Sequence, residues 1–378
     1  MTTNFNRTHA AQQLTTELLR FNTINPPGME RACAQHLGAK LEAAGFQCVY
    51  HEFAPSRTTL VATIGGKHDK SPICFTGHID TVPLGAAAWS RDAFTGELDG
   101  DKLYGRGSTD MKSGVAAFVV AAIALAPQLK NSCGIVLIIT ASEETGCEGV
   151  NDLVSRQLLD RAGAIVVAEP TANYPCIGHK GLMWLEFEAR GVTAHASMPE
   201  QGDNAIVKIA RAIDTLTNYK FEQTSHPLMG NNTLNVSSVQ GGMNPNSVPD
   251  RASIIVDIRT VAGTSHAHIC QSLACALGDG ISMRKIQDVP SVYTEPDNGW
   301  IQQVFATCAP FVTEPIEPKT IQFSTDASAL QRGYKNPPTI ILGPGQPELA
   351  HQTDEWCSVD KLEQSVEIFT LLMRQWCL

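Results

Sequence analysis

Two histidines in the sequence lie in short segments of a kind that binds metal ions. His78 follows an apolar stretch, and Asp80 comes two residues later. On extended backbone, residues i and i+2 point the same way, so the carboxylate can hold the imidazole in one tautomer. His351 follows the glycine- and proline-rich segment 343–349. A histidine oriented by a carboxylate is a typical zinc ligand, and a turn histidine that only bonds backbone is the alternative.

Three further segments supply acidic residues. Asp110 precedes an apolar helix candidate, so it is either a metal ligand or a helix cap. Glu143 and Glu144 follow the most apolar strand candidate, and Glu169 follows another. Crowded carboxylates repel one another unless a cation or a shared proton offsets the cost. The adjacent pair therefore predicts one metal ligand and one base.

Together these segments provide two imidazoles and three carboxylates, with no thiolate. The predicted ligands are His78, Asp110, Glu144, Glu169 and His351. Such a donor set predicts zinc, with cobalt or manganese as possible substitutes. If Asp110 bridges two ions, each ion has one histidine, one glutamate and a share of the aspartate, which leaves room for a bridging water. The segments lie just past predicted strands, where α/β sheets have their ligand sites.

The predicted elements around these segments alternate between helix and strand. Several strand candidates are continuous apolar runs, which are typical of strands covered on both faces. This pattern predicts a layered α/β domain. The predicted strands are 59–64, 71–76, 134–140, 164–168 and 339–342, and the predicted helices are 8–21, 29–44, 300–308 and 359–375.

The middle of the chain has a different order of elements. It reads as strand, helix, strand, strand, helix, strand, which is the order of a small ferredoxin-like α+β unit. The predicted elements are 184–190, 204–218, 233–239, 252–259, 265–276 and 281–287. We therefore expect a discontinuous catalytic domain, 1–180 and 292–378, with an inserted domain, 181–291.

Composition excludes several classes of protein. The net charge of the 378 residues is −10, and no basic cluster is present, which argues against a nucleic-acid partner. The 11 cysteines include no Cys-x-x-Cys pair, so reduced thiols in a cytoplasmic protein are expected. We find no secretory signal and no run of about 20 apolar residues. The apolar stretch 115–126 predicts a buried helix, and no membrane partner is expected.

The motifs together resemble a metallopeptidase family. The family includes acetylornithine deacetylase, succinyl-diaminopimelate desuccinylase, aminoacylase and carboxypeptidase G. The resemblance runs in order from segment 21–28 to His351. It implies a mixed-sheet, zinc-exopeptidase-like catalytic domain, an inserted lid or dimerisation domain, two zinc ions per subunit, and a homodimer.

The resemblance also implies a role for each predicted ligand. His78 and Glu169 would hold one zinc, Glu144 and His351 would hold the other, and Asp110 would bridge. The Asp110–Met111 peptide is expected in the cis form. For two further residues the implied roles are catalytic: Asp80 would orient His78, and Glu143 would be the general base.

Three residues of the inserted domain are implied to bind substrate. His195 would reach into the partner's active site and bind the carbonyl oxygen. Asn246 and Arg259 would hold the substrate carboxylate. The planar fork of an arginine at a strand end suits a carboxylate, although an ordinary edge-strand charge is the alternative for Arg259.

The predicted activity is metal-dependent hydrolysis of the amide bond of a small N-acyl amino acid. Segments 178–181, 324–327 and 343–345 resemble the deacetylase and carboxypeptidase branches more than the desuccinylase. A desuccinylase, or a carboxypeptidase or dipeptidase, is the alternative within the family. A two-metal phosphoesterase could use similar ligands, but the Glu143–Glu144 pair and the sparse basic residues argue against a phosphate substrate. A non-catalytic binding module is a weaker alternative.

Overall fold

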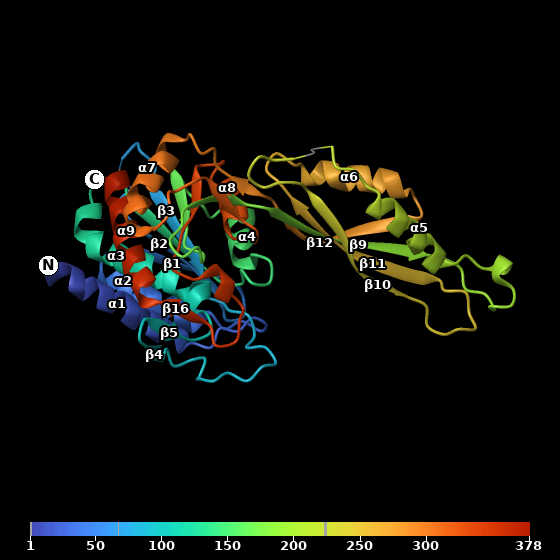
Figure 1. Ribbon diagram of the computed structural model, residues 1–378, viewed down its shortest axis with the longest axis horizontal. Helices are drawn as coiled ribbons and strands as arrows, with labels where there is room; N and C mark the ends of the chain where they lie inside the picture. Colours follow the sequence, from blue (N-terminus) through green and yellow to red (C-terminus); the bar gives the residue numbers. More distant parts are fainter. Residues whose placement is uncertain (1, 67, 223–224) are drawn as a thin grey trace. The chain divides into compact units, whose positions relative to one another are not determined.

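The computed structural model describes residues 2–66, 68–222 and 225–378, and the side chains from residue 9 onward in the first of these ranges (Figure 1). The chain divides into two compact units. The predicted boundaries at 180/181 and 291/292 lie within two residues of the breaks, and one short segment from further along the chain joins the smaller unit. The large unit is Met1–Gly178, Tyr293–Lys319 and Thr325–Leu378, and the small unit is His179–Val292 and Thr320–Ser324.

A nine-stranded mixed sheet forms the centre of the large unit. Strands β6, β3, β7 and β15 are neighbours and run parallel, whereas β1, β2 and β8 are antiparallel to their partners. The predicted mixed-sheet α/β fold is thereby confirmed. In sheet order the strands are β1 (Gln47–Ala54), β2 (Arg57–Ile64), β6 (Ile135–Thr140), β3 (Ile73–His78), β7 (Ala164–Val167), β15 (Thr339–Ile341), β8 (Cys176–His179) and β13 (Val292–Tyr293), and β14 (Lys319–Ile321) pairs with β8.

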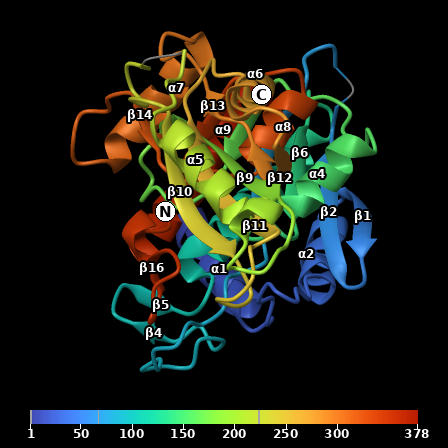
Figure 2. The same ribbon diagram turned by 90° about the vertical axis from the view of Figure 1, so that its right-hand side faces the viewer.

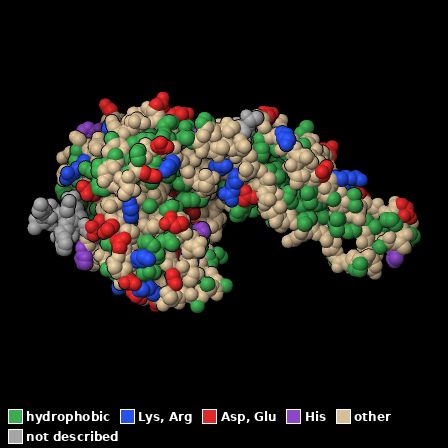
Figure 3. Space-filling view, viewed as in Figure 1, with side chains coloured by type: hydrophobic (Ala, Val, Ile, Leu, Met, Phe, Trp, Pro, Cys, Tyr) green, Lys and Arg blue, Asp and Glu red, His purple; other side chains and the backbone are tan. Residues whose placement is uncertain are grey.

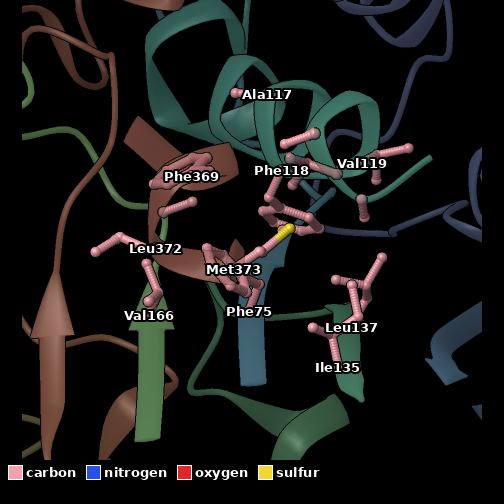
Figure 4. Packing of buried hydrophobic residues seen from close by; sticks show 14 of the residues in the cluster. Phe75, Ala117, Phe118, Val119, Ile135, Leu137, Val166, Phe369, Leu372 and Met373 are labelled. Atoms are coloured by element: carbon pink, nitrogen blue, oxygen red, sulfur yellow. The ribbon is translucent and has the colours of Figure 1, made fainter. Parts of the chain in front are cut away.

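The central strands are buried along their whole length. Every residue of β3, β6 and β7 is buried, as their continuous apolar sequences predict. Helices α3 (Ser113–Leu129) and α9 (Val359–Cys377) pack on this part of the sheet (Figure 4). The Phe75 ring lies 6.2 Å from that of Phe118 and 5.4 Å from that of Phe369, between ring centroids. Close packing of large side chains makes this sheet a rigid support for the loops that follow its strands.

Several elements of the large unit were not predicted from the sequence. Strand β1 is half exposed and carries mixed polar residues, so it lacks an apolar run. Helices α4 (Glu148–Ser155) and α8 (Ala327–Gly333) have 8 and 7 residues, too few for a clear helical period. A small sheet of order β16-β5-β4 consists of two- and three-residue strands. Its strands are β16 (Trp356–Ser358), β5 (Lys102–Tyr104) and β4 (Leu98–Asp99).

The remaining helices of the large unit largely follow the predicted pattern. Helix α1 begins earlier than expected, and residues 2–8 of it carry no described side chains. The stretch Ser108–Leu129 is long and apolar enough to cross a membrane, but 72% of its most apolar window is buried within the protein. That burial is typical of a core helix. The helices are α1 (Thr2–Leu19), α2 (Arg31–Ala43) and α7 (Gly299–Cys308).

The small unit has the predicted order of elements, and two helices cover one face of its four-stranded antiparallel sheet (Figures 1 and 2). Alternate residues of the strands, such as Leu185 and Val256, pack against Ile209 and Leu273 of the helices. The elements are β9 (Gly181–Arg190), α5 (Ala205–Thr217), β10 (Thr233–Gly241), β11 (Arg251–Thr260), α6 (His266–Leu277) and β12 (Ile281–Val289), and the sheet order is β10-β11-β9-β12.

Candidate metal centre

Four neighbouring parallel strands bring the predicted ligands to one edge of the large sheet. β3 ends at His78, and the Glu143–Glu144 turn follows β6. Glu169 follows β7, and the loop that carries His351 follows β15. Because these strands are parallel neighbours, their carboxyl ends meet at one edge, where α/β sheets bind ligands.

The ligand side chains form two groups that share Asp110. In the first group, His78 Nε2 lies 3.1 Å from Asp110 Oδ1 and 3.9 Å from Glu169 Oε1. In the second group, His351 Nε2 lies 3.2 Å from Glu144 Oε2 and 3.4 Å from Asp110 Oδ2. Asp110 thus turns one carboxylate oxygen to each histidine.

The backbone around Asp110 explains why its side chain is free to face both histidines. Asp110 lies in the turn Ser108–Lys112, with non-helical φ and ψ of −122° and 93°. Helix α3 begins at Ser113, and its N-cap residue is Lys112. The alternative interpretation of Asp110 as a helix cap is therefore wrong. The Asp110–Met111 peptide is cis, as expected.

Asp80 connects the His78 segment to the Glu143–Glu144 turn. His78 Nδ1 lies 3.0 Å from the Asp80 backbone oxygen and 3.5 Å from Oδ1 of the same residue. The Asp80 carboxylate also accepts hydrogen bonds from the backbone N–H groups of Glu143 and Glu144, at 3.0 and 3.2 Å, and from Asn25 Nδ2 at 2.9 Å. One buried carboxylate therefore orients an imidazole and fixes a neighbouring turn.

Two glycines let the loop after β15 approach the other segments closely. A Cβ atom on Gly343 would lie 2.2 Å from the Ala168 carbonyl oxygen, and one on Gly345 would lie 2.2 Å from that of Thr109. Both distances are far below van der Waals contact, so neither position accepts a side chain. The loop of His351 is thereby packed against the end of β7 and against the turn of Asp110.

The pKa shifts reflect a crowded negative site. Burial raises the pKa of Glu169 well above its ordinary value, and repulsion from Asp110 adds to this effect. Burial and the nearby Asp110 likewise raise the pKa of Glu144. Burial would also raise the pKa of Asp110, but hydrogen bonds with His351 and His78 outweigh it and lower that pKa. Hydrogen bonds to Asp110 and Glu144 raise the pKa of His351 to about 10.

These groups fit a divalent metal centre. In each group the three donor atoms lie within 4.8 Å of one another. Glu144 Oε1 is buried and has no hydrogen-bond partner among the described residues, so it needs another positive group nearby. A bound divalent cation would be the largest local charge and would relieve the repulsion among the carboxylates. Imidazole and carboxylate donors without thiolates match the expected zinc, cobalt or manganese chemistry.

Glu143 lies in a separate cluster, which was not predicted from the sequence. The Cys147 thiol lies 3.6 Å from Glu143 Oε1, and both residues group with Asp326. Asp326 accepts a hydrogen bond from Thr140 Oγ1 at 2.5 Å, and within the described ranges its Oδ1 is buried with no geometric hydrogen bond. Burial raises the pKa of Glu143 well above its ordinary value, with repulsion from Glu169 as a further cause.

Of the three residues implied to bind substrate, the small unit places His195 and Asn246 near each other and Arg259 apart from them. His195 is exposed and forms an isolated antiparallel β-bridge with Ser247. The Ala196 N–H donates to the Asn246 backbone oxygen at 3.0 Å. His195 and Asn246 therefore lie at one end of β11, just before it starts. Arg259 lies at the other end of β11, and a ten-residue strand spans roughly 30 Å. A single small unit does not bring His195 and Arg259 together.

Comparison with known proteins shows the family of the chain. Residues 74–375 match the model described as peptidase family M20/M25/M40. The chain belongs to this family. It is 30% identical over 356 residues to an acetylornithine deacetylase of Myxococcus xanthus, covering 90% of each chain. It is also 30% identical over 350 residues to a probable succinyl-diaminopimelate desuccinylase of Staphylococcus aureus, covering 84% of this chain and 87% of the relative. The chain is thus an M20-family hydrolase, as predicted.

Solved structures share the fold of this M20-family hydrolase. An M20 family metallo-carboxypeptidase of Sulfolobus solfataricus has a TM-score of 0.80 at 17% identity, covering 97% of this chain and 99% of the other. A Bacillus subtilis protein described as a dinuclear metal binding peptidase from the M20 family has a TM-score of 0.72 at 15% identity, covering 98% and 99%. At these identities the likeness concerns the fold.

Several polar residues around the candidate metal centre of this M20-family hydrolase were not predicted from the sequence. Glu355 and Arg106 form a buried ion pair beside the Asp110 turn, with 2.7 Å between Arg106 Nη1 and Glu355 Oε2. The Asn25 and Asp326 side chains were also missed. Asn25 lies within segment 21–28, and Glu355 lies four residues after His351. Spacing alone gave no reason to single them out, because their partners are distant in sequence.

Proposed function

We propose that this M20-family hydrolase cleaves the amide bond of a small N-acyl amino acid, as an acetylornithine deacetylase would. The observation that carries the proposal is the shared carboxylate of Asp110, which faces His78 on one side and His351 on the other. Glu143 follows β6 at the same edge of the sheet and supplies the remaining acid–base group. A two-metal hydrolase needs this combination of ligands and base.

The two groups are the proposed holders of two metal ions. His78 and Glu169 would hold one ion, Glu144 and His351 would hold the other, and Asp110 would bridge them. The two histidines favour zinc, with cobalt or manganese as substitutes. When bound, such ions supply a Lewis acid for the carbonyl oxygen and a water of lowered pKa.

Glu143 is the proposed general base. The Asp80 carboxylate holds the Glu143 backbone N–H at 3.0 Å, which fixes the turn that carries the side chain. The Glu143 carboxylate takes a proton from the attacking water, whose oxygen bonds to the carbonyl carbon. The C–N bond then breaks, and Glu143 returns the proton to the leaving amine. The products are a free amine and a carboxylic acid.

Arg259 is the proposed partner of the substrate carboxylate. Its guanidinium already makes a forked contact with Asp257, at 2.8 and 3.0 Å, and Trp184 Nε1 donates to the same carboxylate at 2.8 Å. The Arg259 side chain is still 36% exposed, so part of the guanidinium faces solvent. A fork held in this way is preorganised to bind a second carboxylate.

A homodimer is proposed because His195 and Arg259 lie at opposite ends of one sheet. If both residues contact one small substrate, they come from different subunits, and His195 acts on the partner's active site. Hydrophobic side chains gather on the surface of the small unit (Figure 3). Strand β10 is an edge of its sheet, and exposed apolar residues lie on it and beside it. These residues are Ile206, Val207, Val239 and Met243.

A desuccinylase is the second candidate, because the Staphylococcus aureus relatives named as probable desuccinylases reach the same 30% identity. A panel of N-acetylornithine, N-succinyl-diaminopimelate, N-acetylmethionine and a dipeptide, assayed with zinc or cobalt, separates the candidates. We expect the highest kcat/KM for an N-acetyl amino acid. A chromogenic phosphodiester serves as the control for the phosphoesterase alternative, and its turnover above that of every amide would contradict the proposal.

The variant Glu143→Gln tests the mechanism. We expect kcat to fall by about a hundredfold to ten-thousandfold, because the general base is lost, while two metal ions remain bound. Glu367→Gln, at an exposed position of α9, is the matched control and should leave kcat unchanged. Near-normal turnover by metal-loaded Glu143→Gln would remove Glu143 from this role.

A cytoplasmic location without nucleic-acid or membrane partners remains a prediction. All 11 cysteines lie in the described part of the chain, and all of them are free thiols. Free thiols agree with a reducing compartment.

A further inference from the structure

The Glu355 carboxylate is fully buried and accepts hydrogen bonds from four donors. Three donors are backbone N–H groups of the turn that carries Asp110: those of Gly107 at 3.0 Å, Thr109 at 2.8 Å and Asp110 at 3.0 Å. The fourth donor is Arg106 Nη1, at 2.7 Å. Glu355 itself is 0% exposed. The carboxylate thus replaces the hydrogen bonds that this irregular turn cannot make within itself.

Arg106, the partner of Glu355, contacts two further loops of the metal centre. It is 2% exposed, so its charge is buried with that of Glu355. Arg106 Nη1 donates to the backbone oxygen of Gln352 at 3.2 Å, next to His351. Arg106 Nη2 donates to the backbone oxygen of Pro83 at 3.1 Å, in the loop that follows Asp80. One ion pair therefore joins the segments that carry His78, Asp110 and His351.

A buried ion pair is costly to desolvate, so stability alone is a poor explanation for this one. Apart from the bond between Arg106 and Glu355, the hydrogen bonds described above join this pair to the backbone of segments that carry a proposed ligand. Groups that hold metal ligands in place typically change metal affinity about 10- to 100-fold when they are lost. The contacts of Glu355 have the arrangement expected of such a group.

We propose that Glu355 is a positioning residue for the metal centre: through the Gly107–Asp110 backbone and through Arg106, it holds the Asp110 carboxylate between His78 and His351. This inference rests on the proposed two-metal function. Glu355 has no contact with substrate in the proposal and acts only through Asp110 and the His351 loop.

The alternative is a structural ion pair, and the chain contains a matched control for it. Glu30 is also 0% exposed and is paired with Arg57, whose Nε lies 3.2 and 3.0 Å from the two Glu30 oxygens. Arg57 Nη1 donates to the Pro27 backbone oxygen at 3.0 Å. In the described part of the chain neither side chain hydrogen-bonds to the Asp110 turn, although the Glu30 charge interacts with those of Asp80 and Lys112. Glu30→Gln thus removes a buried carboxylate and leaves the hydrogen bonds between Glu355 and the Asp110 turn in place.

The experiment compares Glu355→Gln with Glu30→Gln in the full-length protein. The metal dissociation constants are measured by competition with a chromogenic chelator, and kcat, KM and the free energy of unfolding of the metal-free protein are measured alongside. We expect both variants to lose stability. Only Glu355→Gln should bind zinc about 10- to 100-fold more weakly, and it should lose kcat with little change in KM.

A dissociation constant of Glu355→Gln within twofold of that of Glu30→Gln overturns the inference. If Glu355→Gln does not fold, Arg106→Lys decides, because it keeps the buried charge but loses the fork that reaches Pro83 and Gln352. At least fivefold weaker zinc binding by Arg106→Lys supports the inference, and unchanged binding overturns it. If the wild-type protein binds no zinc, cobalt or manganese, the proposed function itself fails, which is a distinct result.

Discussion

At the scale of single residues, Asp110 is the group that both halves of the candidate centre share. Each of its carboxylate oxygens faces a different histidine, at 3.1 and 3.4 Å. The backbone N–H of Asp110 donates to the Glu355 carboxylate, and Asp110 lies outside the regular hydrogen bonds of helix α3. A residue in such a turn can aim its side chain at a site only because distant groups satisfy the backbone.

A pH dependence of stability is expected from His179. Burial lowers the pKa of His179 from 6.5 to about 4. The unfolded state therefore takes up a proton below pH 6.5 while the folded state does not, so stability is complete above pH 6.5 and falls until pH 4. The difference corresponds to about 3 kcal/mol, at about 1.36 kcal/mol for each pKa unit.

The measurement uses urea unfolding of metal-free protein at pH 6.5 and 4.5, because metal binding adds a pH dependence of its own. His179→Gln should lose less stability between these pH values than the wild-type protein. His9→Gln, at an exposed position of α1, is the control and should behave as the wild type. Equal losses in His179→Gln and wild type would show that His179 titrates normally.

At the scale of elements, the parallel strands decide where the chemistry lies. β6, β3, β7 and β15 are buried and adjacent, and their carboxyl ends carry four of the five proposed ligands. The fifth ligand, Asp110, comes from the turn before α3, a helix packed on the same sheet. Rigid packing of these elements keeps loop residues within reach of one another.

The exposed edge of β10 leads to a prediction about assembly. Val239 is 61% exposed on this edge strand, beside the exposed residues of α5. We expect a dimer in light scattering after gel filtration. Val239→Lys should weaken the dimer at least tenfold, because it places a charge in an apolar interface.

The matched control is Val49→Lys, because Val49 is 51% exposed on β1, an outer strand of the large sheet. This variant should remain as dimeric as the wild type. A wild-type protein that is monomeric and fully active would rule out both the proposed dimer and the action of His195 in trans.

At the scale of the whole molecule, metal ions should stabilise the folded chain. The ligands come from segments between residues 78 and 351, so the unfolded chain has no such site. A metal ion that binds only the folded state adds about 2.7 kcal/mol per site to the free energy of unfolding when its concentration is a hundred times the dissociation constant. Chelation by EDTA should therefore lower Tm, and added zinc should restore it.

Asp110→Asn provides the comparison, since it weakens the shared ligand of both groups. Its Tm should respond little to EDTA or zinc, whereas His351→Ala should keep about half of the wild-type response. If the wild-type Tm is insensitive to EDTA and zinc, the two-metal centre is excluded as a stabilising element.

The sequence by itself determined the strands that carry the ligands and the ligands themselves as candidates. Continuous apolar runs marked β3, β6 and β7, and the residues at or just after their ends, such as His78 and Glu169, were visible by position. The order of elements in the small unit was visible for the same reason. Apolar periodicity and strand ends are local properties of a sequence, so a local pattern is enough to find them.

Only the tertiary structure decided which residues meet. The strand order β6-β3-β7-β15 brings Glu144 and His351 together, although they are far apart in the chain. The folded chain also pairs Glu355 with Arg106, and strand β11 of the small unit separates His195 from Arg259. These contacts depend on how packed elements stack and on which buried polar groups must find partners, and both are properties of the folded chain as a whole.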